Sequence, residues 1–217
     1  MKRKSKKNYW PLYLLGGGLL ASLIFLLYIF RYLWLPEKSS SIQTPNLAPE
    51  SVLNFRHPLT GEPSAIEIPK PQVFAVMVEN SAEAWPLSGL DQAFLVIEAP
   101  VEAKIPRLEG FYYLGQKEVE KIGPVRSARP YYVDWAEEFG ALYAHVGGSP
   151  AALKQITASN DLFDLNEFWH GPNFWREAFR FIPHNVYTST ELLTQAFSNQ
   201  TSSTDYGLWA FKDDTPT

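Results

Sequence analysis

The sequence predicts an α/β protein, with a mixed, partly parallel sheet carrying helices on both faces, preceded by one N-terminal transmembrane helix. Three observations support this fold class. An uncharged run over residues 8–30 stands near the start of the chain. Beyond it, short apolar runs bounded by Pro, Gly or Ser alternate with stretches of helical spacing. The phrase Gly-Gly-Ser-Pro at 147–150 joins two such stretches, as in units that build parallel sheets with right-handed crossovers.

The N-terminal segment is expected to anchor the chain in a membrane. As a helix, the uncharged run would be about 34 Å long, which is enough to cross a bilayer. Tyr9 and Trp10 at one end and Trp34 at the other are placed as interfacial aromatic residues. Because five cations precede the run, we expect residues 1–7 in the cytoplasm and a single-pass helix over 8–35 in the cell membrane. A cleaved signal peptide is the alternative, but its apolar region usually has only about 7–15 residues.

An extracytoplasmic domain is expected after a short tether. Residues 36–51 are rich in Pro and Ser without periodicity, which predicts a tether whose root-mean-square reach is about 20–25 Å. The domain follows over 52–213, with a tail at 214–217. From residue 36 onward, 13 Lys and Arg stand against 23 Asp and Glu, so this part carries about −10. That charge argues against a nucleic-acid partner, which requires a basic surface. The absence of cysteine excludes disulfides, a thiolate nucleophile and an acylated-cysteine anchor.

The elements of the domain follow in chain order. Apolar, β-branched or aromatic runs between turn residues predict strands at 73–79, 94–99, 108–114, 117–123 and 141–146. Helical spacing predicts helices at 131–139, 150–158 and 191–198. Ser149 is placed as the N-cap of the second helix, with Pro150 at its first position. The succession of strand, helix, strand and helix from 117 to 158 predicts the parallel part of the sheet.

The loop after His145 is the first candidate site, because ligands of α/β proteins gather at the carboxyl ends of strands. The backbone amides of Gly147, Gly148 and Ser149 lead into a helix N-terminus, where such a nest can hold a carboxylate or phosphate. The alternative is a tight turn at the glycines, with Ser149 only capping the helix. Ser149, His145 and Asp164 can also be drawn as a catalytic triad, but these residue types often occur together by chance.

A second candidate is the phrase GPVRSARP at 123–130. It brings Arg126, Ser127 and Arg129 to a junction between a predicted strand and a predicted helix. Forked guanidinium groups bind carboxylate or phosphate at two points, which makes the pair a candidate anion site. The alternative is that both arginines form internal salt bridges, for which the surplus of acidic residues offers many partners.

Carboxylates and histidines supply candidates for catalysis. Glu98 and Glu102 flank a proline, and two carboxylates beside a cleft are the groups that hydrolyse glycans, although a solvated edge is their more usual position. Arg107, a candidate for ligand binding, follows a further proline, Pro106. In PHNVYTS, His184 and Asn185 are placed to orient a ligand hydroxyl or a proton transfer. The four histidines lack metal-ligand spacing, and no phosphate-binding loop or nucleophile elbow occurs, so we expect neither a metal nor another cofactor.

Aromatic residues that precede the phrase PHNVYTS offer a possible stacking surface. Phe168, Trp169 and Trp175 lie in the segment before PHNVYTS and have the ring types that stack on sugars. The alternative, that each packs in the core, is the more common fate of such residues.

Four phrases together resemble the N-terminal domain of the DUF3048 family: HPLTGEP at 57–63, the stretches 73–108 and 121–153, and FWRE with PHNVYTSTELL within 174–193. The resemblance implies an envelope-anchored bacterial protein whose biochemical activity is unknown. Members commonly carry an acylated cysteine and continue into a second domain. Here we expect the helix to replace the lipid. Any activity that needs both domains would be missing, unless a partner supplies the second domain or the sequence is a truncated form.

The candidate residues form two sets. Those for catalysis are Glu98, Glu102, His145 and His184. Those for ligand binding, which include Arg176 through the family resemblance, are Arg107, Arg126, Ser127, Arg129, Gly147, Gly148, Ser149, Arg176 and Asn185.

The leading hypothesis is a membrane-anchored extracytoplasmic module that binds an anionic or glycan component of the cell envelope, or an envelope protein. Two alternatives stay open. One is an envelope enzyme, either a glycoside hydrolase or a phosphoryl transferase acting on wall polymers. The other is a structural scaffold whose polar residues only hold the fold together.

Overall fold

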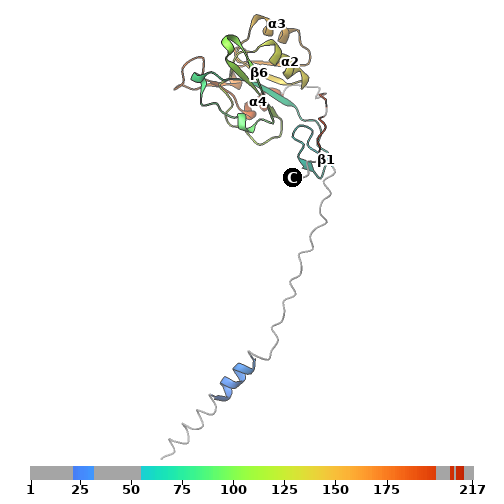
Figure 1. Cartoon of the computed structure of the whole chain (residues 1–217), viewed down its shortest axis with the longest axis vertical. Helices are drawn as coiled ribbons and strands as arrows, with labels where there is room; N and C mark the ends of the chain where they lie inside the picture. The colour runs from blue at the N-terminus through green and yellow to red at the C-terminus, as the bar shows by residue number, and fades with distance from the viewer. Residues whose placement is uncertain (1–21, 32–54, 199–205, 208, 213–217) are drawn as a thin grey trace, which may run out of the picture. The chain divides into compact units, whose positions relative to one another are not determined.

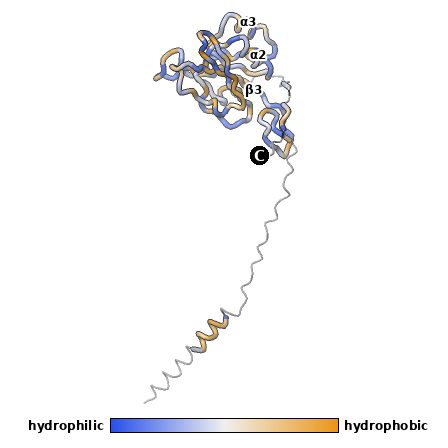
Figure 2. The backbone as a smooth tube through the Cα atoms, viewed as in Figure 1, coloured by the Kyte–Doolittle hydropathy of each residue, from blue (hydrophilic) through white to orange (hydrophobic). Residues whose placement is uncertain are grey.

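The computed structural model describes residues 22–31, 55–198, 206–207 and 209–212, and the chain divides into two units, 1–50 and 51–217. In the first unit, residues 22–31 form an apolar helix (Figures 1 and 2). None of the helices in the described part of the chain has the length and apolar character that a membrane crossing requires. Most of the predicted 8–35 span, the cytoplasmic N-terminus and the tether lie outside the described residues, so these assignments stay predictions.

A five-stranded mixed sheet forms the centre of the second unit (Figure 1). Its strands, in spatial order, are β4 (Leu95–Pro100), β5 (Pro106–Tyr113), β3 (Val73–Glu79), β6 (Leu142–His145) and β7 (Phe163–Asn166). The β4–β5 and β5–β3 pairs are antiparallel, whereas β3–β6 and β6–β7 are parallel. The predicted α/β class with a mixed, partly parallel sheet is confirmed.

Helices and smaller elements complete this unit. The helices are α2 (Pro130–Glu138), α3 (Pro150–Ala158) and α4 (Thr190–Phe197). Two short antiparallel pairs are β1 (Phe55–Arg56) with β2 (Pro63–Ser64), and β8 (Trp175–Arg176) with β9 (Val186–Tyr187). Single 3-10 turns are η1 (Ala82–Ala84), η2 (Leu90–Gln92), η3 (Glu102–Lys104) and η4 (Gly171–Asn173). The hydroxyl of Ser149 accepts the Ala152 amide at 3.2 Å, so the predicted cap of α3 forms.

The core lies on both faces of the sheet, and β3 shows why. All seven residues of β3 are buried, and its tube has a hydrophobic colour in Figure 2. Val73, Ala75 and Met77 pack with residues of α2 and α3 on one face. The alternate residues of β3 pack on the other face with Leu193 of α4. A central strand between two helical layers must be apolar at every position, which is why 73–79 was predictable.

Two predicted features of the sheet differ in the structure. The predicted strand 117–123 is wrong: Val119 and Ile122 are buried, but the segment joins none of the sheets and makes only isolated bridges, such as Ile122 with Thr188. Gly123, at φ 145°, and Pro124 interrupt any regular ladder there. The parallel neighbours of β6 are instead β3 and the short β7, whose alternation of apolar and polar residues is too brief to stand out in sequence.

Candidate functional site

The segment 124–129 runs across the carboxyl ends of β3 and β6, which end side by side because the two strands are parallel. Its main chain is bound to both. The Arg126 amide donates to the Met77 carbonyl at 2.9 Å, and the Arg126 carbonyl accepts from the Val146 amide at 3.0 Å. The Ala128 amide donates to the Gly147 carbonyl at 2.9 Å. The GPVRSARP phrase therefore mounts its arginines at the edge where ligands of α/β proteins collect.

A buried carboxylate at the end of β3 holds the first group of polar side chains. Oε2 of Glu79 lies 3.1 Å from Nε of Arg126 and 2.8 Å from Nδ1 of His184. The other oxygen, Oε1, accepts a hydrogen bond from the Ser81 hydroxyl at 3.2 Å. We call these four residues the Glu79 cluster. Two sequence candidates far apart in the chain, Arg126 and His184, thus meet at one carboxylate oxygen.

Three arginines gather along the same segment, and we call Arg107, Arg126 and Arg129 the arginine group. Arg107, from β5, is buried and donates to the Ser127 carbonyl at 2.6 Å. Arg129 donates from Nε and from one terminal nitrogen to the two oxygens of Glu102, each at 2.7 Å. Burial first, and then repulsion from Arg129 and Arg126, lowers the pKa of Arg107. The three cations therefore act on one another, and Glu79 and Glu102 offset them only in part.

The two glutamates that were candidates for glycan hydrolysis, Glu98 and Glu102, occupy different surroundings. The hydrogen bonds from Arg129 lower the pKa of Glu102 to about 2. Glu102 is thus ionised at neutral pH and has no proton to give to a leaving group. Glu98 is exposed and accepts from Asn80 at 3.3 Å. Glu102 therefore does not supply the protonated acid that paired-carboxylate hydrolysis requires.

We expect Glu102→Gln to lower the free energy of unfolding by less than about 1 kcal/mol at pH 7, because the Glu102 side chain is 65% exposed. The folded pKa lies below the unfolded one, so this contribution is present above about pH 4.5 and disappears as pH falls through about 2. Urea unfolding at pH 7 and pH 3, with Glu98→Gln as the exposed control, measures it. A loss above about 3 kcal/mol at pH 7 would show that the pair is not solvated.

The loop after β6 is a tight turn held by its own chain. His145 is fully buried, with Nε2 at 2.7 Å from Oδ1 of Asp164 and Nδ1 at 2.7 Å from the Gly147 carbonyl. The Gly147 amide donates to the Asn166 side chain at 3.1 Å, and the Ser149 amide donates to the Ala128 carbonyl at 3.2 Å. Two of the three amides in the predicted nest are therefore occupied. At φ +58°, Gly147 holds a conformation that favours glycine.

The possible triad of Ser149, His145 and Asp164 does not assemble. The Ser149 hydroxyl caps α3, and the second nitrogen of His145 lies at the Gly147 carbonyl instead of at Ser149. The side chains of Ala128 and Leu153 lie close to Gly148. A Cβ at position 148 would be 3.2 Å from the nearest side-chain atom of each. The residues after β6 thus shape the turn that supports segment 124–129.

The remaining candidates lie around β8 and β9. Arg176 donates to Glu167 at 2.9 Å and to the Asn185 side chain at 3.1 Å, so these two ligand-binding candidates partner each other. Trp175 stacks on Tyr187. Phe168 and Trp169 are exposed, as a stacking surface would require.

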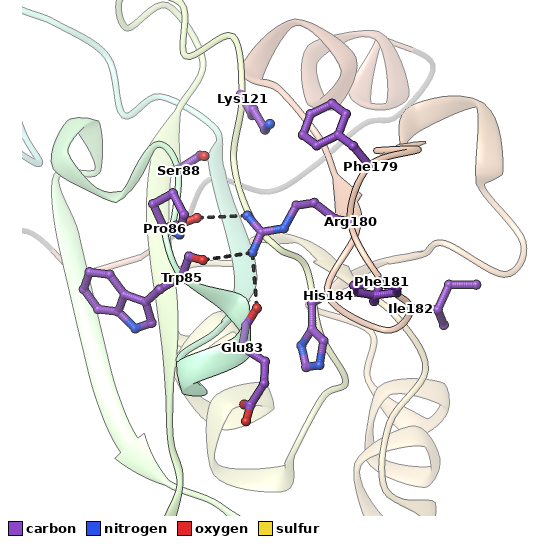
Figure 3. Close-up of a pocket in the computed structure, with 10 residues that line it drawn as sticks. All are labelled: Glu83, Trp85, Pro86, Ser88, Lys121, Phe179, Arg180, Phe181, Ile182 and His184. Atoms are coloured by element: carbon purple, nitrogen blue, oxygen red, sulfur yellow. Dashed lines mark hydrogen bonds between the residues drawn. The ribbon is translucent and has the colours of Figure 1, made fainter.

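An open pocket of about 600 Å³ adjoins the Glu79 cluster (Figure 3). Its two sides are the segments 83–88 and 179–184, and Lys121 lies at its edge. The Arg180 guanidinium crosses between them and donates to the carbonyl of Pro86 (Figure 3). It also donates to the carbonyl of Ala84. His184 belongs to both the pocket and the Glu79 cluster. The sequence signal for this pocket, the apolar run Phe-Arg-Phe-Ile before PHNVYTS, has no periodicity that would distinguish it from core residues.

Metal binding finds no support within the part of the chain that the structure describes. No three His, Asp or Glu side chains there are grouped as metal ligands would be. Glu79 and Glu102 at this edge of the sheet instead pair with arginines.

The arrangement of these motifs has a counterpart among known proteins. The family model described as "Protein of unknown function (DUF3048) N-terminal domain" matches residues 59–204, more than half of the chain. The chain belongs to the DUF3048 family. The resemblance predicted from the sequence phrases is thereby confirmed.

Two comparisons place this DUF3048 chain beside a Bacillus subtilis protein. It is 36% identical over 157 residues to "Putative lipoprotein YerB" of strain 168, which covers 72% of this chain and 46% of that protein. It also matches the crystal structure of YerB from Bacillus subtilis with a TM-score of 0.62 and 34% identity, covering 70% of this chain and 52% of that one. The DUF3048 chain therefore spans about half the length of the relatives it matches.

Proposed function

We propose that this DUF3048 chain is a binding module at the cell membrane, with a single-pass N-terminal anchor and an extracytoplasmic domain that binds an anionic group of an envelope component. The observation that carries the proposal is the arginine group, in which Arg107, Arg126 and Arg129 gather at the carboxyl edge of the sheet. Phosphate and carboxylate groups are the anions that guanidinium forks bind at two points.

Local charge supports this reading over a purely structural one. Glu79 pairs with Arg126 and Glu102 with Arg129, whereas Arg107 donates only to a backbone carbonyl, and Glu79 is also shared with His184. A cationic surplus that is partly removed from water is costly, so an anion bound there gains more than it would at an exposed surface. The rest of the exported part carries a large negative charge, which makes this surplus distinctive.

The proposed location rests on sequence and kinship. The basic residues 1–7 and the uncharged run that follows favour a cytoplasmic N-terminus and a single span. The Bacillus subtilis relative is named "Putative lipoprotein YerB", and this name supports an envelope location for this chain. Ligands reachable there include the anionic glycans of the wall and lipid-borne phosphates. A glycoside hydrolase is less well supported, since Glu102 is held ionised by Arg129.

Titration of the full chain in non-ionic detergent micelles with inorganic pyrophosphate tests the proposal. We expect saturable binding in 150 mM salt, which would be weakened about tenfold or more by Arg126→Gln or Arg129→Gln, because each removes charge-assisted hydrogen bonds. Arg129→Lys should retain part of the affinity, since it keeps the charge but loses the fork. Lys154→Gln, on the exposed side of α3, is the matched control and should bind normally.

Two results would count against this function. One is the absence of saturable binding by the unaltered chain. The other is an equal loss of affinity in Lys154→Gln, which would mean that the anion responds only to net charge. Circular dichroism of each variant separates lost binding from lost folding.

A further inference from the structure

We infer that the loop 179–182, together with Trp85, docks onto a lipid surface, an inference that rests on the membrane anchoring in the proposed function. Phe179, Phe181 and Ile182 are 81%, 89% and 75% exposed, and Trp85 is 61% exposed. We call these four residues the docking surface. Large apolar side chains gathered at one exposed place on a folded domain mark a surface that something else covers.

The docking surface is built on a fixed backbone. The His184 amide donates to the Phe181 carbonyl at 2.8 Å, and the Arg180 amide donates to the Glu177 carbonyl at 3.3 Å, so the loop is a closed turn. Arg180 ties this turn to the facing segment through the carbonyl of Pro86 (Figure 3) and through that of Ala84. The Trp85 indole nitrogen donates to Asn80 at 3.1 Å. Both segments thus present their apolar side chains from supported positions.

The charged groups at the base of the docking surface already have partners. Lys121 lies 2.6 Å from Glu177 and 4.1 Å from the centre of the Tyr187 ring. The Arg180 guanidinium is occupied by backbone carbonyls, and His184 is bound to Glu79. Entry of the aromatic rings into an apolar layer would therefore not strip these charges of their partners. Glu83 lines the same pocket. In the docked state it would stay among the lipid headgroups and limit how deeply the docking surface enters the bilayer.

The length of chain before the domain favours a bilayer as the occupant. The predicted span ends at residue 35 and the first described residue of the domain is 55. The 19 residues between them can extend to at most roughly 65 Å, so the anchored domain stays within reach of its own membrane in any orientation. Tethering of this kind gives an effective concentration on the order of millimolar, at which weak docking is sufficient. Trp, Phe and Ile are also the side chains that enter the interfacial layer of bilayers.

Docking would bring the Glu79 cluster to the headgroup layer, because His184 lies in both the pocket and that cluster. The anionic group bound by the arginine group would then be carried by the membrane. This deepens the proposed function by naming the side from which its ligand arrives.

The absence of cysteine makes a direct test simple, since Ile182→Cys introduces a single thiol for an environment-sensitive fluorophore. The full chain would be reconstituted in vesicles of phosphatidylethanolamine and phosphatidylglycerol, with and without doxyl-labelled phospholipid. We expect blue-shifted emission at position 182 and quenching roughly twofold or more stronger than at Lys154→Cys on exposed α3. Adding Phe179→Ser and Phe181→Ser to the labelled chain should reduce the quenching to the Lys154→Cys level.

Flotation on a density gradient accompanies the fluorescence measurement and separates the two ideas. If the chain floats with vesicles but the probe at 182 is quenched no more than the probe at 154, docking is overturned while the anchor stands. If the chain does not float, the anchor and the docking that rests on it are both overturned. A third outcome is a blue shift that grows with protein density and is not accompanied by quenching. It would assign the docking surface to a second copy of the chain and would also overturn the inference. The pyrophosphate titration, performed in micelles, succeeds or fails independently.

Discussion

Glu79→Ala is expected to lower the free energy of unfolding by about 3 kcal/mol, because the Glu79 side chain, unlike that of Glu102, is only 8% exposed, and its loss leaves partly buried Arg126 without its countercharge. His184 and Ser81 lose the same carboxylate. The two strands that end at this point are among the most buried of the domain, so an uncompensated cation there has little access to water. Urea unfolding of the full chain in micelles at pH 7, followed by near-ultraviolet circular dichroism, measures the loss.

A double variant makes this expectation specific. Replacing both members of the pair, in Glu79→Met with Arg126→Met, should recover much of the stability, since apolar residues of similar size tolerate burial. Ser81→Ala removes one neutral donor and should cost only about 1 kcal/mol. A small loss in Glu79→Ala, close to that of Ser81→Ala, would mean that water reaches Arg126 and that the cluster is solvated.

A pH-dependent effect on stability is expected from Glu109, on β5. Its side chain is fully buried, and neither carboxylate oxygen has a hydrogen-bond partner. Burial raises the pKa of Glu109 well above its usual range. Glu109 interacts electrostatically with two tyrosines, Tyr132 of α2 and Tyr143 of β6. The Tyr143 hydroxyl also lacks a hydrogen-bond partner. We therefore expect Glu109 to be protonated in the folded domain at neutral pH.

The sign of the effect follows from proton binding. The folded state holds the proton more tightly than the unfolded state, so stability falls as pH rises from the unfolded pKa near 4.5 toward the folded pKa. Glu109→Gln should remove this slope, and Glu109→Met should raise the free energy of unfolding at pH 8 by about 1–3 kcal/mol. Chemical unfolding at pH 5 and pH 8 compares the three chains. An identical slope in the unaltered chain and in Glu109→Gln would place the titration elsewhere.

Much of the fold could be predicted because single elements carry their own signals. The run 73–79 is apolar at every position, as a strand covered on both faces must be. Ser149 followed by Pro150 marked the start of α3. The segment 117–123 misled because Val119 and Ile122 are as buried as strand residues, while the hydrogen-bond partners that would have made a ladder lie elsewhere. Burial of a residue can be predicted from sequence, but the strand with which it pairs is determined by the tertiary structure.

The candidate site was predictable only in its parts. The rule that ligands meet strand ends selected the neighbourhood of Arg126, and the chemistry of guanidinium selected the arginines. Spacing could not show that His184 reaches the same oxygen of Glu79, because a long stretch of chain separates them. Nor could it show that Ser149 and His145 turn away from each other, since that depends on the Gly147 turn.

The main-chain bonds of segment 124–129 have a consequence for the entropy of binding. Arg126 is hydrogen-bonded through its main chain to β3 and to the residue that follows β6, and Ala128 to the turn at 147–149, although both belong to a connecting loop. A loop that must order itself around a ligand loses conformational freedom on binding, and that loss weakens affinity. Here the backbone beneath the guanidiniums has already lost that freedom during folding. The anion binding that we propose at this edge would therefore rely on a rigid backbone, with adjustment confined to side chains.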